Sequence, residues 1–183
     1  MAANTDNGIG FWRVAIWGGA ALLLAVPLIA MQFTTEVIWS PTDFAVAGVL
    51  LVAVAFGLDM AMRSSHSWSF RIGAGLAIAA AFGLIWVNLA VGFFADEGNA
   101  ANLAFLGVLA VALIGALIAR FRAAGMWAAM LAAAAAQVLV GVVGYTAGWA
   151  SPGQHGLYEV SMGTILFTAL WLASAWLFRR AAR

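Results

Sequence analysis

The sequence has no cysteine, no lysine and few charged side chains of any kind. Without cysteine the chain can form no disulfide, no iron–sulfur cluster and no thiolate-bound metal site. All eight basic residues are arginine, so no lysine is present for a Schiff base with retinal or pyridoxal, or for a phosphate-binding loop. Charged residues make up 8% of the 183 residues, whereas soluble domains have roughly a quarter. These absences exclude an ordinary soluble domain.

Hydrophobic residues make up 66% of the chain and form six long apolar runs. A helix that spans a bilayer needs about 20 consecutive apolar residues, because every backbone polar group in hydrocarbon must be paired within the segment. The predicted helices cover residues 11–31, 41–62, 72–95, 103–119, 126–149 and 160–178. The first run is followed by no small-x-small cleavage pattern, so we expect a retained helix rather than a signal peptide. We therefore predict an all-α, polytopic membrane bundle of six transmembrane helices in a single domain, 1–183.

The arginines predict the orientation of this bundle, because basic residues in short loops stay on the cytoplasmic side. They lie before the first run, in alternate loops and after the last run: Arg13, Arg63, Arg71, Arg120, Arg122, Arg179, Arg180 and Arg183. The other loops contain acidic residues and no arginine. Both termini are therefore expected to be cytoplasmic, in the inner membrane of a bacterium.

Local signals refine two of the predicted helices. Ser40, Pro41 and Asp43 supply a capping serine, a proline at the first helical position and an acid at the third, so a helix should begin there. The run 126–149 is rich in alanine and contains Gly144 and Gly148, a small-xxx-small pair that allows close helix approach. We expect this helix to lie at the centre of the bundle.

Asp59 is the ionisable residue that lies deepest in an apolar run, so it raises the question of function. About 18 residues separate it from Pro41, which at 1.5 Å per residue places it about 27 Å along the helix, near the cytoplasmic boundary. Arg63 follows four residues later on the same face. A structural ion pair is the favoured interpretation, and a proton or cation site is the alternative.

Asn88 and Gln137 are the remaining strong polar groups within the predicted spans. Each amide can donate and accept, so we expect hydrogen bonds between helices that hold the bundle together. The alternative is a small polar pocket lined by both amides and by Trp86. The hydroxyl groups of Thr146, Thr164, Thr168 and Ser174 are expected to bond to their own helices.

The outer loops gather oxygen and imidazole groups suited to a hard divalent cation, but their spacing matches no known metal-binding loop. Solvated acidic loops are therefore the favoured interpretation, and metal sensing is the alternative. The segment 31–44 is too polar to span and too apolar to be free in water, so we expect it to lie against the outer surface or a partner. The candidate outer-face interaction residues are Glu36, Trp39, Asp96, Glu97, His155 and Glu159.

Catalytic patterns are missing from the sequence. It has no nucleophile elbow, no phosphate loop, no helix with paired zinc-binding histidines and no inward carboxylate dyad. His66 and His155 belong to loops on opposite sides of the membrane, so they cannot ligate one haem together. We expect no enzymatic activity, no cofactor, no metal and no nucleic-acid partner.

Several segments resemble a group of small uncharacterised bacterial multi-pass inner-membrane proteins. The similarity covers most of the chain and is carried by residues 17–44, by the segment Ile85-Trp-Val-Asn-Leu-Ala-Val-Gly92, by the turn Asn99-Ala-Ala-Asn-Leu103 and by Ala119-Arg-Phe-Arg122. The group's turn commonly has proline where Ala100 stands here. The resemblance implies a multi-helix membrane fold and carries no assigned activity.

Two functions are compatible with these features. The first is a non-enzymatic accessory or scaffold subunit that packs against lipids, other membrane proteins or further copies of itself, because small residues are abundant and intramembrane polar groups are few. The second is a small transporter or channel that uses Asp59, Asn88 and Gln137 for a proton, an ion or a small neutral solute.

Overall fold

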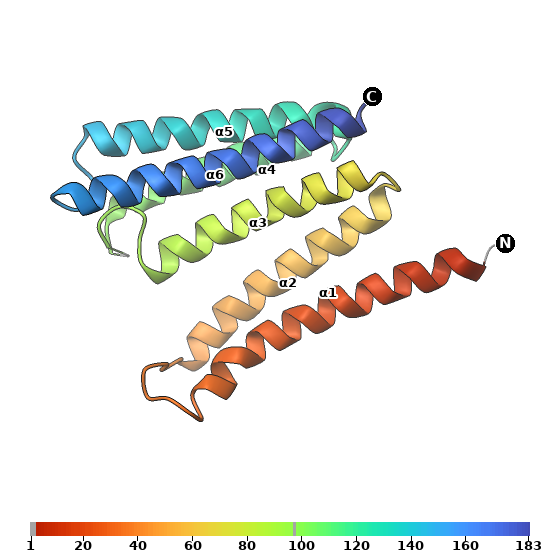
Figure 1. Cartoon of the computed structure of the whole chain (residues 1–183), viewed down its shortest axis with the longest axis horizontal. Helices are drawn as coiled ribbons and strands as arrows, with labels where there is room; N and C mark the ends of the chain where they lie inside the picture. The colour runs from red at the N-terminus through yellow and green to blue at the C-terminus, as the bar shows by residue number, and fades with distance from the viewer. Residues whose placement is uncertain (1–2, 97) are drawn as a thin grey trace. The chain divides into compact units, whose positions relative to one another are not determined.

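The structure, a computed structural model, describes residues 3–96 and 98–183 and is all-helical over them. Six helices are long and apolar enough to cross a membrane, as predicted. Their bounds are α1 Ala3–Ala30, α2 Pro41–Ser64, α3 Trp68–Ala90, α4 Ala104–Ile118, α5 Ala123–Thr146 and α6 Gln154–Ala181, with a 3-10 turn η1 at Ala100–Leu103 (Figure 1). The chain divides into two compact units, Met1–His66 and Ser67–Arg183.

The first unit is an antiparallel hairpin of α1 and α2. Leu24 of α1 lies against Gly48 of α2, and Arg13 reaches Asp59 at the opposite end. The predicted start of α2 is confirmed: the Ser40 backbone N–H donates to Asp43 at 2.7 Å, and the Asp43 N–H donates to the Ser40 hydroxyl at 3.3 Å. This reciprocal capping box satisfies amides that the helix itself leaves free.

In the second unit the helices pack in the order α3, α6, α5, α4 (Figure 1). Small residues set the contacts, since a side chain at Gly141 would overlap Thr164 of α6 and one at Gly115 would overlap Ala129 of α5. Close backbone approach supplies the packing energy that hydrophobicity cannot supply in lipid. Both α5 and α6 thus have a neighbour on each side, so α5 shares the central place that we predicted for it alone.

The loop after α3 begins earlier than the sequence predicted, at residue 91 instead of 96. The backbone N–H groups of Val91 and Gly92 both donate to the Val87 carbonyl, and Gly92 has φ 74°. A left-handed glycine at this position ends a helix. The following N–H groups, of Phe93 and Phe94, donate to the Asn102 side chain instead of continuing the helix.

Other helix ends also differ from the prediction: α1 begins at Ala3 and not at 11, α3 begins at Trp68 and not at 72, and α6 ends at Ala181 and not at 178. α5 ends at Thr146 and not at 149, because Gly148 has φ 70° and the Trp149 N–H donates back to the Gly144 carbonyl. Gly148 therefore ends the helix, and because a Cβ there would meet no atom within 4 Å, the small-xxx-small match with Gly144 marks no close helix contact. α6 begins at Gln154 and not at 160, since the helix continues through polar residues until Gly153, with φ 94°, breaks it.

Candidate functional site

The carboxylate of Asp59 forms an ion pair inside the first unit. Its Oδ2 lies 2.8 Å from Nη2 of Arg63, and its Oδ1 accepts a hydrogen bond from Nε of Arg63 at 3.2 Å. This two-point contact is the predicted one-turn pair. Arg13 of α1 adds a second cation at 3.7 Å, a partner that the sequence did not predict. Asp59 is 8% exposed, so two arginines surround a largely buried carboxylate and tie α1 to α2.

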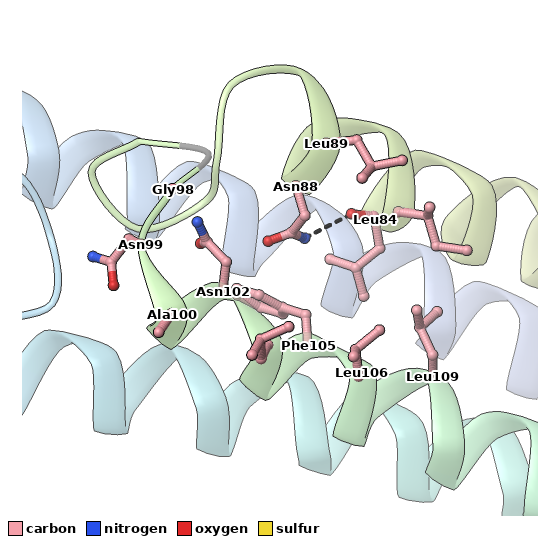
Figure 2. A pocket seen from close by; sticks show the side chains of 12 residues that line it. Leu84, Asn88, Leu89, Gly98, Asn99, Ala100, Asn102, Phe105, Leu106 and Leu109 are labelled. Atoms are coloured by element: carbon pink, nitrogen blue, oxygen red, sulfur yellow. Dashed lines mark hydrogen bonds between the residues drawn. The ribbon is translucent and has the colours of Figure 1, made fainter. Parts of the chain in front are cut away.

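A pocket of about 410 Å³ lies between α3 and the segment formed by η1 and α4 (Figure 2). Asn88, Asn99 and Asn102 line its polar part, and leucines from both helices line the rest. The Asn88 side-chain nitrogen donates to the Leu84 carbonyl at 2.7 Å, within its own helix, while its buried Oδ1 has no hydrogen-bond partner among the described residues. The expected interhelical bond from Asn88 is therefore wrong, because the nearest acceptor is the carbonyl one turn earlier.

The other two asparagines are structural. Asn102, 8% exposed, accepts from the backbone N–H groups of Phe93 and Phe94 at 3.0 and 2.8 Å and donates to the Asp96 carbonyl at 2.6 Å. Asn99 accepts from the Ala101 N–H at 2.9 Å, which caps η1. Both side chains thus fix the loop that bounds the pocket.

The rings of Phe93 and Phe94, whose backbone N–H groups bond to Asn102, fill this end of the second unit. Phe93 lies in the space left by Gly163 of α6, and Phe94 in the space left by Gly144 of α5. Both rings also contact Phe105 of α4, at centroid distances of 4.3 and 5.1 Å. The loop after α3 is therefore wedged between three helices and gives the pocket a rigid wall.

Gln137 belongs to a different environment from Asn88. Its side chain on α5 is fully buried, and neither its oxygen nor its nitrogen has a hydrogen-bond partner within the described part of the chain. The contact of Gly141 with Thr164 sets the antiparallel register of α5 and α6, which places Gln137 level with Thr168. Trp171 lies one turn further along α6 and is 1% exposed.

The buried polar atoms of Thr164, Thr168 and Trp171 also lack partners in the described structure. We refer to Gln137 and these three side chains as the buried polar group. Threonine in a helix usually bonds back to its own carbonyls, and Thr146 does so at 3.0 Å. Thr164 and Thr168 have no such bond, so the expectation is wrong for these two residues. An unpartnered polar atom in a low-dielectric interior is costly, so several together require an explanation.

The structure separates the residues that we expected around one polar pocket. Gln137 and Trp86 do not line the pocket that contains Asn88. Trp86 is 36% exposed and stacks on Phe82 with a centroid distance of 5.8 Å. The amides of Asn88 and Gln137 therefore lie in two distinct environments: Asn88 lies in the pocket beside α4, and Gln137 lies between α5 and α6.

The outer-face candidates are distributed over both units. Glu36 is exposed, and its N–H donates to the Thr34 hydroxyl at 3.1 Å, while the Trp39 ring packs edge-on against Phe44 at 5.2 Å. In the second unit Asp96, His155 and Glu159 are exposed, and Glu97 lies outside the described residues. Within residues 3–96 and 98–183, no group of three histidine or acidic side chains is arranged to hold a metal.

Sequence reasoning missed three roles that depend on tertiary structure. Asn102 organises the loop after α3, although only its place in the turn 99–103 distinguished it. Ser174, expected to bond to its own helix, instead donates to the Gly73 carbonyl of α3 at 2.7 Å while fully buried. The four-residue spacing of Thr164 and Thr168 on one helix face was the available signal for the buried polar group.

Comparison of the chain with known protein families, curated proteins and solved structures finds no match. The resemblance to small bacterial inner-membrane proteins therefore stays a prediction.

Proposed function

We propose that this protein is a non-enzymatic accessory or scaffold subunit of a bacterial inner membrane, packing against lipids and other membrane proteins. The supporting observation is the state of Asp59. Among the residues whose burial is described, it is the one buried ionisable side chain, and two arginines neutralise it. A paired carboxylate near a helix end stabilises a hairpin, and among the described residues no other ionisable side chain is buried that could serve acid–base catalysis or proton transfer within the core.

A scaffold subunit is defined by the proteins that it binds, so the deciding experiment measures the mass of the complex that contains it. The protein is extracted from its native membrane in polymer nanodiscs without detergent, and the particle mass is determined by native mass spectrometry. We expect a stoichiometric complex with another membrane protein or with further copies of the chain. A monomer accompanied only by lipid would overturn the scaffold proposal.

The proposed orientation, with both termini in the cytoplasm, rests on the arginine distribution. Since the chain has no native cysteine, single-cysteine variants report topology directly. We expect a membrane-impermeant maleimide to label Glu36→Cys in intact cells with a permeabilised outer membrane, and His66→Cys only after lysis. Labelling of both variants in intact cells would contradict the topology.

A second candidate function is the passage of a small neutral solute such as water, and the buried polar group favours it. Donors and acceptors without protein partners at mid-helix are what a transient polar ligand requires. Stopped-flow light scattering of liposomes tests this candidate. Faster water flux through the wild-type protein, lost in Gln137→Leu and kept in Ser174→Ala, would support it, and equal flux in empty liposomes would exclude it.

A further inference from the structure

The pocket beside α4 is ordered from polar to apolar along the direction of its helices. Asn99 and Asn102 lie at its loop end, Asn88 lies about 3 Å before the end of α3, and Leu109 lies about 10 Å further along α4 than Asn102 (Figure 2). In a membrane, a helix end lies at the depth of the lipid headgroups and the leucines lie within the hydrocarbon. The polar and apolar parts of the pocket therefore follow each other as do the polar and apolar parts of an amphipathic molecule oriented along the bilayer normal.

Among the described side chains that line the polar part of the pocket, Oδ1 of Asn88 is the one atom without a hydrogen-bond partner, and it is an acceptor. The side-chain oxygens of Asn99 and Asn102 accept hydrogen bonds from backbone N–H groups. The nitrogen of Asn88 faces the Leu84 carbonyl, which can only accept, so the amide cannot be turned round and Oδ1 lies buried at the wall of the pocket, without a partner among the described residues. Oδ1 and the Asn102 side chain point toward the same space (Figure 2). A molecule that satisfies Oδ1 must bring a hydrogen-bond donor.

The charge and volume of the pocket narrow the class of ligand. None of the described residues that line it carries a charge, so they offer no counterion for a phosphate or a carboxylate. Its volume of about 410 Å³ lies at the small end of the range for small-molecule sites, about 300–1,000 Å³, which suits one aliphatic chain and a small polar end. Because α3 and α4 do not pack closely together, the aliphatic chain of a ligand can enter the pocket sideways from the bilayer.

We propose that this pocket binds a single-chain membrane lipid whose uncharged polar end carries a hydroxyl group. The hydroxyl donates to Oδ1 of Asn88, and the aliphatic chain lies along Leu106 and Leu109. Lipids of this class include long-chain alcohols and monoacylglycerols. The site is independent of the scaffold function, since it would exist in a monomer or in a complex.

Photo-crosslinking in vesicles tests the site with a matched pair of probes. The full chain is reconstituted in phosphatidylcholine vesicles, whose headgroup has no hydrogen-bond donor. One probe is a long-chain alcohol with a diazirine in its tail, and the other is the methyl ether of the same alcohol. Labelling of residues 84–89 and 103–109 is measured by peptide mass spectrometry and normalised to residues 113–118, whose leucines and isoleucines are largely exposed.

We expect the alcohol to label the pocket segments about threefold more than the ether, the ratio that one hydrogen bond gives in a membrane protein. Asn88→Leu keeps the side-chain size and removes the acceptor, so it should abolish this difference. Equal labelling by both probes, or an undiminished preference in Asn88→Leu, would overturn the hydroxyl assignment.

Leu109→Trp provides a second variant that keeps Asn88 and fills the apolar part of the pocket. We expect it to reduce labelling of residues 84–89 by both probes to the level of the reference segment. Circular dichroism and thermal unfolding establish whether each variant is folded. If Asn88→Leu does not fold, Leu109→Trp tests the lipid site. Unchanged labelling in a folded Leu109→Trp protein would overturn the site itself.

Discussion

Replacing Asn102 with alanine removes three hydrogen bonds that hold the loop after α3. The side chain accepts from two backbone N–H groups and donates to one carbonyl, with all three distances at or below 3.0 Å. Each bond contributes about 1 kcal/mol net, and a buried group left without a partner costs about 1–3 kcal/mol. Because the Phe93 and Phe94 amides lie in a buried segment, water cannot readily replace the lost acceptor. We expect Asn102→Ala to lower the free energy of unfolding by about 3 kcal/mol or more.

Asn99→Ala is the matched control, since it changes the same residue type in the same turn. Asn99 caps η1 through one short bond, and its second bond, to the Trp149 carbonyl, is 3.4 Å long. Loss of such a cap costs about 1 kcal/mol. The assay is reversible unfolding in mixed micelles, combined with amide hydrogen exchange at Phe93 and Phe94. Exchange there should accelerate about a hundredfold in Asn102→Ala. Equal destabilisation by the two variants would refute the role assigned to Asn102.

Four further variants test other parts of the structure. Gly144→Ala should destabilise the protein by about 1–3 kcal/mol, because its methyl group would overlap the enclosed Phe94 ring, whereas Gly107→Ala, which meets no atom within 4 Å, should be neutral or slightly stabilising in the same unfolding assay. Ser174→Ala should cost about 0.6 kcal/mol by removing the hydroxyl bond to the α3 backbone, and a cost above about 2 kcal/mol would contradict a single interhelical bond. Asp59→Asn should lower stability by about 1 kcal/mol, since its two arginine partners are half exposed, and should leave proton flux into liposomes unchanged; altered flux would favour a transporter.

The sequence predicted those features that depend on local pattern and on the thickness of the bilayer. Six spans follow from run length, the start of α2 from Ser40 and Asp43, and the Asp59 pair from a four-residue spacing. The end of α3 was mispredicted because Val91, Phe93 and Phe94 are apolar and extend the hydrophobic run. What ends the helix is Gly92 together with an acceptor on Asn102, later in the chain, which no hydropathy window includes.

Hydrogen-bond partners across helices were beyond sequence reasoning for a related reason. A hydroxyl such as that of Ser174 can bond to its own helix or to a neighbour, and the choice depends on how close the neighbour lies. Gly73 brings the α3 backbone near enough to accept. The same applies to Arg13, whose contact with Asp59 depends on the antiparallel register of α1 and α2.

Three amides in the second unit differ in how completely the protein satisfies them, and that difference separates structure from binding. Asn102 uses its oxygen and its nitrogen on the backbone and fixes a loop. Asn88 uses only its nitrogen, and Gln137 uses neither atom. In hydrocarbon an unsatisfied amide costs free energy that a leucine of similar size would not, and a molecule from outside the chain that completed the bonding would remove this cost. A leucine at position 137 should therefore make the protein more stable, and any activity that it abolishes belongs to the buried polar group and not to the fold.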